Sequence, residues 1–139
     1  MKTLRLDDVD PTLIDGTLWK PIRSTLGVRA FGVNAYTARA AGDRLFNEHD
    51  ETESFAGRQR HEELYVVLEG RATFTVDGEE VDAPALTLVF VENPAARRGA
   101  VAAAPGTTVL AIGGPVGEAY EPGLWEERFL SQVRARSTT

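Results

Sequence analysis

Two short segments of the chain each combine a histidine with carboxylates at a spacing that could serve metal or acid–base chemistry. His49 lies two residues before Glu51, and His61 lies two residues before Glu63. In an extended strand the side chains alternate between the two faces, so residues two apart point the same way. If both segments are strands, we therefore expect each histidine to share a face with its carboxylate.

Two imidazoles and two carboxylates that converge would suit a divalent first-row metal. His49, Glu51, His61 and Glu63 are therefore candidate ligands for iron, manganese, nickel or zinc, and a protein without any metal is equally compatible with them. His61 could instead act as a general base, because its reference pKa lies near 6.5 and neighbouring carboxylates would raise it. A histidine in a solvated, acidic loop end is the simpler alternative for this residue.

The elements that would position these side chains are short strands separated by turn residues. Asp77-Gly78, directly after an alternating run, is the strongest hairpin signal in the chain. About eight strands without intervening helices predict an all-β sandwich or closed barrel, and their even spacing favours a double-sheet jelly roll. The expected strands cover residues 28–38, 45–51, 63–68, 72–76, 80–82, 86–91, 98–103 and 107–112.

The two ends of the chain have a different character from this core. Residues 1–27 predict an irregular N-terminal arm that packs on the barrel, with Trp19 among its anchors. Residues 28–114 form the predicted barrel. In residues 115–139, Trp125 and Phe129 recur at helical spacing, which predicts a short C-terminal helix.

Composition narrows the possible partners. The 139 residues suit one domain, and 15 basic against 21 acidic residues give a net charge of −6, which argues against nucleic-acid binding. The absence of cysteine excludes disulfides, thiolate zinc sites and iron–sulfur clusters. No apolar run approaches the roughly 20 residues that span a bilayer, and the first residues turn acidic where a signal peptide would be apolar. We expect a cytoplasmic protein with no membrane or nucleic-acid partner.

The run from His61 to Val81, in which Glu63 lies seven positions ahead of Gly70, resembles the first conserved motif of the cupin superfamily. Residues 83–94 resemble its second motif, and the resemblance covers about residues 28–114. It implies a cupin-like double-stranded jelly-roll β-barrel that often holds a metal in its mouth. It also implies a homodimer, in which the N-terminal arm could pair with the neighbour's sheet.

The chain departs from the superfamily pattern at most of the usual ligand positions. Residues 56–59 occupy the places of the paired histidines, so His49 and Glu51 fill them only if residues 52–60 are an inserted loop. The histidine that ends the second motif is replaced by Arg97, which cannot ligate a metal. An inward Arg97 could pair with a buried carboxylate or clamp a carboxylate ligand, and a solvent-facing Arg97 is the alternative.

Three functions remain open at this point. One is a metal-dependent enzyme, such as a dioxygenase or isomerase, that acts on a small metabolite. Another is a metal-free barrel that binds a small ligand as a sensor or accessory protein. The third is a structural dimer with no ligand. Barrel mouths commonly bind small molecules, and the candidate pocket residues are Arg97, Tyr65, Asn34, Tyr36, Phe74 and Phe90.

Overall fold

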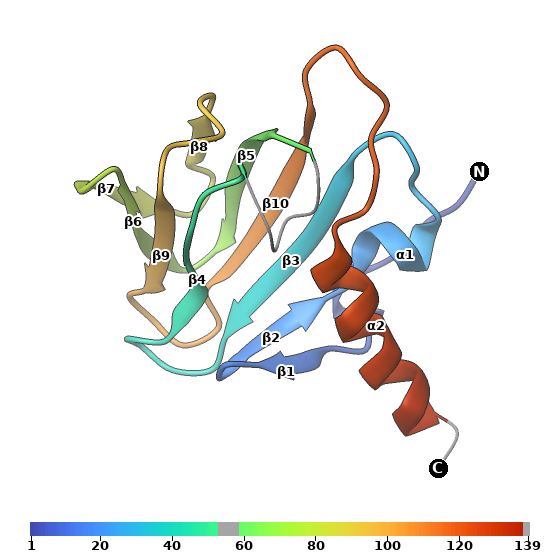
Figure 1. Cartoon of the computed structure of the whole chain (residues 1–139). Coiled ribbons are helices and arrows are strands. Elements are labelled where there is room, and N and C mark those ends of the chain that lie inside the picture. Colours follow the sequence, from blue (N-terminus) through green and yellow to red (C-terminus); the bar gives the residue numbers. More distant parts are fainter. Residues whose placement is uncertain (53–58, 138–139) are drawn as a thin grey trace.

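The structure, a computed structural model, describes residues 1–52 and 59–137, so most of the predicted loop at 52–60 lies outside the described residues. Within this part of the chain, ten strands form two antiparallel sheets that make the walls of a barrel (Figure 1). The strands are β1 (Thr12–Ile14), β2 (Thr17–Lys20), β3 (Gly32–Ala38), β4 (Arg44–His49), β5 (His61–Glu69), β6 (Arg71–Val76), β7 (Glu79–Pro84), β8 (Leu88–Val91), β9 (Arg98–Ala102) and β10 (Thr108–Pro115).

The predicted all-β jelly roll is confirmed. The larger sheet has the order β1-β2-β3-β10-β5-β8, and the smaller sheet has the order β4-β9-β6-β7. β5 joins the larger sheet and the next strand, β6, joins the smaller one, so the chain crosses between the walls at Gly70, which has a φ of 74°. A glycine fits this left-handed conformation without the strain that a side chain would add.

The N-terminal arm is more regular than the sequence predicts. It contains a 3-10 turn (Leu6–Asp8), the β1–β2 hairpin and α1 (Ile22–Leu26). The hairpin turns at Asp15 and Gly16, both with positive φ, and β2 then pairs with β3 of its own chain. The prediction of an irregular arm was wrong because Thr17–Lys20 alternates in burial and adds a strand to the sheet.

Two apolar clusters lie on opposite faces of the larger sheet. The barrel interior holds the main core, in which Leu45, Val67 and Phe74 have no exposed surface. On the outer face, Val33 and Ala35 of β3 are covered by Ile22 of α1 and by apolar residues of the N-terminal segment. The interior of the barrel is therefore filled by side chains of its own strands, and the N-terminal arm covers only the β3 side of the outer face.

The predicted C-terminal helix is present as α2 (Leu124–Ser137), and it lies against β2 at the open side of the barrel (Figure 1). Trp125 and Phe129 pack on the fully buried Trp19, with ring centroids 5.8 and 5.7 Å away. Glu126, only 1% exposed, accepts a 2.7 Å hydrogen bond from Arg23 of α1. Over the described residues, neither helix has the length and apolar character needed to cross a bilayer.

Candidate functional site

Three of the predicted ligands meet at the mouth of the barrel. Glu63 lies on β5, where it shares the inward face with Tyr65 and Val67. His49 ends β4 after a register shift, and Glu51 follows the strand, and both side chains reach the same place. One ligand atom from each of the three lies within 4.8 Å of the others. His49 Nε2 is 2.9 Å from Glu51 Oε1 and 3.7 Å from Glu63 Oε1. Donors that each lie about 2.1 Å from an ion are roughly 3 Å apart, so this triad fits a divalent metal.

The triad is a strongly coupled group of charges. Burial alone would lower the pKa of His49, but hydrogen bonds to Glu51 and Glu63 outweigh it and raise the pKa to about 10. Burial raises the pKa of Glu51 to about 7, against the opposing effect of His49. The pKa of Glu63 is lowered in spite of its burial, because His49 and the Tyr65 hydroxyl both donate hydrogen bonds to it. His49 is therefore a cation at neutral pH when no metal competes for it.

The inward arginine is Arg98, and the expectation that Arg97 pairs with the buried carboxylates was wrong. Arg97 is 55% exposed and donates to Glu48 at 2.9 Å, at the outer rim of the cavity. Arg98 has no exposed surface, and its Nε lies 3.8 Å from Glu63 Oε1. β9 begins at Arg98, which pairs directly with His49 of β4. Because directly paired residues share a face of the sheet, Arg98 points into the barrel with His49, and the preceding residue, Arg97, does not.

His61 is buried but lies outside the triad. It stands two residues before Glu63 on β5, and two residues advance a strand by about 6.6 Å. Its Nδ1 is 3.8 Å from Glu51 Oε2, its Nε2 is 3.4 Å from Gln59 Oε1, and its ring packs on Tyr120. Burial lowers the pKa of His61, in contrast to the predicted rise. Its geometry is that of a neutral histidine behind Glu51.

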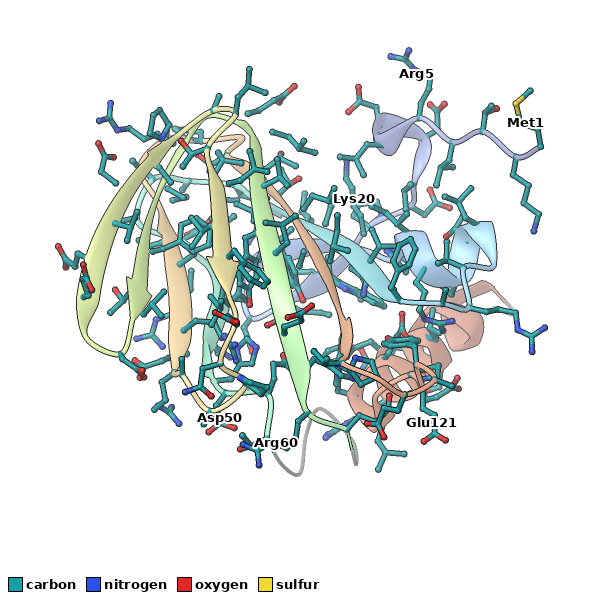
Figure 2. All side chains as sticks on the ribbon, turned by 90° about the horizontal axis from the view of Figure 1, so that it is seen from above. Met1, Arg5, Lys20, Asp50, Arg60 and Glu121 are labelled. Atoms are coloured by element: carbon teal, nitrogen blue, oxygen red, sulfur yellow. The ribbon has the colours of Figure 1, made fainter. Side chains whose placement is uncertain are left out.

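A cavity of about 830 Å³ opens above the triad, between the barrel and α2. Of the predicted pocket residues, Tyr36, Tyr65 and Arg97 line it. Asn34 instead lines an adjoining cavity of about 40 Å³, where its buried Oδ1 has no hydrogen-bond partner among the described residues. Figure 2 shows Asp50, which lines the large cavity, toward the same end of the molecule as Arg60 and Glu121.

Two of the predicted pocket aromatics lie elsewhere. Phe74 has no exposed surface and packs behind Tyr65, with ring centroids 5.5 Å apart, so it supports the wall of the cavity without lining it. Phe90 is 55% exposed, because on β8 the side chains of Val89 and Val91 point inward and Phe90 takes the opposite face. The assignment of Phe90 to the pocket was therefore wrong.

Several lining residues were not predicted. Phe46 stacks on Tyr65 with ring centroids 4.9 Å apart, and the Trp19, Trp125 and Phe129 rings form the opposite side of the cavity. The helical spacing in residues 115–139 indicated a docking face, but the sequence does not show that this face also borders the site. Contacts between α2 and the N-terminal arm decide this, and they join segments about 100 residues apart.

Comparison with known proteins defines the fold. No family model and no curated protein matches the sequence. Several solved structures do match. A predicted oxalate decarboxylase from Thermotoga maritima (14% identity, TM-score 0.64) matches over 81% of this chain and 97% of its own length. A sugar phosphate isomerase of the cupin superfamily from Silicibacter pomeroyi (17%, 0.64) matches over 81% and 74%. An RmlC-like cupin protein from Desulfovibrio desulfuricans (20%, 0.60) matches over 81% and 95%.

The molecule is therefore a small protein of the cupin fold, as the motif from His61 to Val81 predicts. Two of these neighbours are named for different activities, a decarboxylase and an isomerase. At 14 to 20% identity the likeness shows the barrel fold alone, so the function must be argued from the residues of the site.

Proposed function

We propose that this chain is a metal-dependent cupin enzyme that binds a small metabolite in the barrel mouth. His49, Glu51 and Glu63 would hold one divalent ion of iron, manganese, nickel or zinc at the floor of the cavity. One imidazole and two carboxylates form a hard, anionic donor set that suits such ions. The observation that carries the proposal is the convergence of these three donors within 4.8 Å on a cavity of metabolite size.

The side chains around the triad are arranged to keep it in place. Tyr65 donates to Glu63 Oε1 at 2.5 Å, and burial raises the pKa of this hydroxyl, so it remains a hydrogen-bond donor. Arg98 is held by the carbonyls of Pro94 and Asn93 and faces the same oxygen of Glu63. A bound ion would polarise an oxygen of the metabolite as a Lewis acid. Tyr65 and Arg98 would fix the carboxylate that helps to hold it.

A metal-free binding protein is the second candidate, and one observation favours it. Protonated His49 and Arg98 supply two positive charges against the two carboxylates of Glu51 and Glu63, all within a few ångströms. Such a cluster is balanced without an ion, which lowers the cost of burying its charges. In this version the same cavity would bind a ligand without metal-assisted chemistry.

Elemental analysis and calorimetric titration with Mn²⁺, Fe²⁺, Ni²⁺ and Zn²⁺ separate the two candidates. We expect close to one ion per chain, lost in His49→Gln and in Glu63→Gln. His61→Gln is the matched control, because it removes a neighbouring histidine that lies outside the triad, and it should retain the ion. Failure of the chelator-treated protein to bind any of the four ions would reject the enzyme proposal in favour of the metal-free one.

A further inference from the structure

The large cavity is lined by two groups of aromatic rings that meet along one side. Tyr36, Phe46 and Tyr65 form one group on the barrel side, with centroids 4.9 and 5.7 Å from ring to ring. Trp19, Trp125 and Phe129 form the other group on the α2 side, with centroids 5.7 to 5.8 Å apart. Trp19 of β2 is the cross-strand partner of Tyr36 of β3, so the two groups form one continuous aromatic lining. Trp19 itself is fully buried, and the other rings of the lining border the cavity in front of it.

Most charged side chains that line this cavity already have partners. Glu48 pairs with Arg97, Asp15 accepts a hydrogen bond from Asn47 at 2.9 Å, and Asp50 accepts two from Thr52. The triad is satisfied within itself and by its neighbours Tyr65 and Arg98. These carboxylates keep their negative charge, and each already accepts a hydrogen bond or forms an ion pair within the protein.

Two arginines that line the cavity differ from these residues. In the part of the chain that the structure describes, their guanidinium groups form no ion pair and no hydrogen bond. They are Arg44 of β4 and Arg128 of α2, and both line the cavity. Both arginines are exposed. Arg44 and Phe46 both belong to β4 and line the cavity, with a register shift between them. Arg128 lies beside Trp125 and Phe129 on α2. Each group of rings thus has one available guanidinium at the border of the cavity.

We infer that the cavity binds an amphipathic organic anion, with a flat apolar body against the aromatic lining and an acidic group held by Arg44 or Arg128. This inference names the class of ligand for the cavity of the proposed function. It uses the same cavity as that function and does not require a bound metal ion. A volume of about 830 Å³ accommodates a body of one or two fused rings. Guanidinium groups bind carboxylate, sulfonate or phosphate oxygens through charge-assisted hydrogen bonds.

A matched pair of fluorescent probes tests this class directly. 1-Anilinonaphthalene-8-sulfonate has a fused aromatic body with an anionic group, and N-phenyl-1-naphthylamine has the same body without the charge. The chain contains two tryptophans, and both line the cavity, so energy transfer from tryptophan to the probe reports binding to the protein, and the arginine variants locate it. The net charge of −6 repels an anion in general, so a preference for the sulfonate must come from the site.

We expect the wild-type protein to bind the sulfonate more tightly than the neutral amine. Arg44→Gln or Arg128→Gln should weaken the sulfonate about tenfold, the loss of one charge-assisted hydrogen bond, and leave the amine unchanged. Arg29→Gln removes one charge from an exposed residue that does not line the cavity, and it should change neither affinity.

Three results would overturn the inference. They are equal affinity for the two probes in the wild type, an equal loss in Arg29→Gln, and no energy transfer with either probe. The titrations are run on chelator-treated protein whose fold is checked by circular dichroism. A protein that discriminates between the probes but binds no metal ion supports this inference and rejects the metal-dependent function. The two proposals therefore fail separately.

Discussion

Arg98 is a fully buried guanidinium whose one ion pair in the described structure is with Glu63. Removing it takes away one of the two cations that compensate this carboxylate, a change that costs about 3 kcal/mol. We expect Arg98→Met to lower the free energy of unfolding of the chelator-treated protein by about this amount in urea denaturation. Arg97→Met, which removes an exposed ion pair, should cost less than about 1 kcal/mol. Similar losses in both variants would show that Arg98 does not compensate Glu63.

The charges of the triad make the stability of the metal-free protein depend on pH. The pKa of His49 rises on folding from 6.5 to about 10, so its stabilising effect is complete below pH 6.5 and is lost as the pH passes 10. The pKa of Glu51 rises from 4.5 to about 7, so stability is also lost as that group ionises. Both effects have the same sign. We expect the melting temperature in chelator to fall between pH 5 and pH 10.

The matched variant for this pH dependence is His49→Gln combined with Glu51→Gln, which removes both titrating groups. Its melting temperature should change less over the same range than that of the wild type. A wild-type protein that becomes more stable from pH 5 to pH 10 would contradict the assigned pKa shifts. The control for global charge is Glu48→Gln, an exposed carboxylate beside the site.

At the level of single residues, the sequence predicts the triad well and its surroundings poorly. His49, Glu51 and Glu63 follow from alternation in strands that the sequence marks clearly. Arg98 was missed because β9 is rich in small residues, and its sequence does not show which face is inward. A one-residue error in such a strand moves a side chain to the opposite face. Arg97 was chosen because counting along the second motif places it where the superfamily has a histidine ligand.

At the level of elements, α1 and α2 are joined by one buried ion pair. Glu126 is 1% exposed, and its Oε2 lies 2.7 Å from Arg23 Nε. We expect Arg23→Met to release α2, because the helix would otherwise keep an uncompensated charge buried. Hydrogen exchange of the α2 amides should then accelerate while that of β5 and β10 stays slow. The double variant Arg23→Met/Glu126→Met should restore part of the protection.

A matched control for this experiment is Arg128→Met, which removes a cation from the same helix without disturbing a buried pair. Its α2 amides should exchange as in the wild type. Wild-type exchange rates in Arg23→Met as well would show that the helix is held by its aromatic contacts and not by the ion pair. Because α2 forms one wall of the cavity, release of the helix should also weaken ligand binding.

The strands and the C-terminal helix are predictable because their signals are local. Asp77-Gly78 sets the β6–β7 hairpin, and periodic Trp125 and Phe129 set α2. The β1–β2 hairpin was missed because its strands have only three and four residues, too few for alternation to be distinctive. The position of α2 over the cavity depends on contacts with Trp19 and Arg23, and spacing within one segment does not predict such contacts.

At the scale of the whole molecule, the outer face of the larger sheet is only partly covered. The N-terminal segment covers the β3 side, and the β8 side stays open. Leu88 and Phe90 on the edge strand β8 are 61% and 55% exposed, and Leu86 before it is 76% exposed. They leave on the order of 300 Å² of apolar surface in solvent, already comparable with the largest patch of a typical monomer. The uncharged outer residues paired next to them across the sheet are Leu64, Val66, Leu110 and Ile112.

This face suits a second copy of the chain. Each copy has a net charge of −6, so a self-contact requires a patch without charged side chains, and the row described above meets this condition. β8 is an edge strand with an open backbone, and two such strands can pair antiparallel about a two-fold axis. The surface that each copy would bury, with side chains on both sides of the strand pair, would then approach the roughly 800 Å² per partner that a stable interface buries.

We therefore expect a homodimer through β8. The resemblance implies a different contact, in which the N-terminal arm pairs with the neighbour's sheet. Light scattering of the wild-type protein should give twice the chain mass of 15.1 kDa. The double variant Leu88→Lys/Phe90→Lys should give the mass of a single chain. Val101→Lys on β9, a comparably exposed valine of the smaller sheet, is the control and should stay dimeric. A monomeric wild type at micromolar concentration would contradict the expectation. Since these side chains face away from the cavity, the monomeric variant should still bind metal and probe, which separates assembly from function.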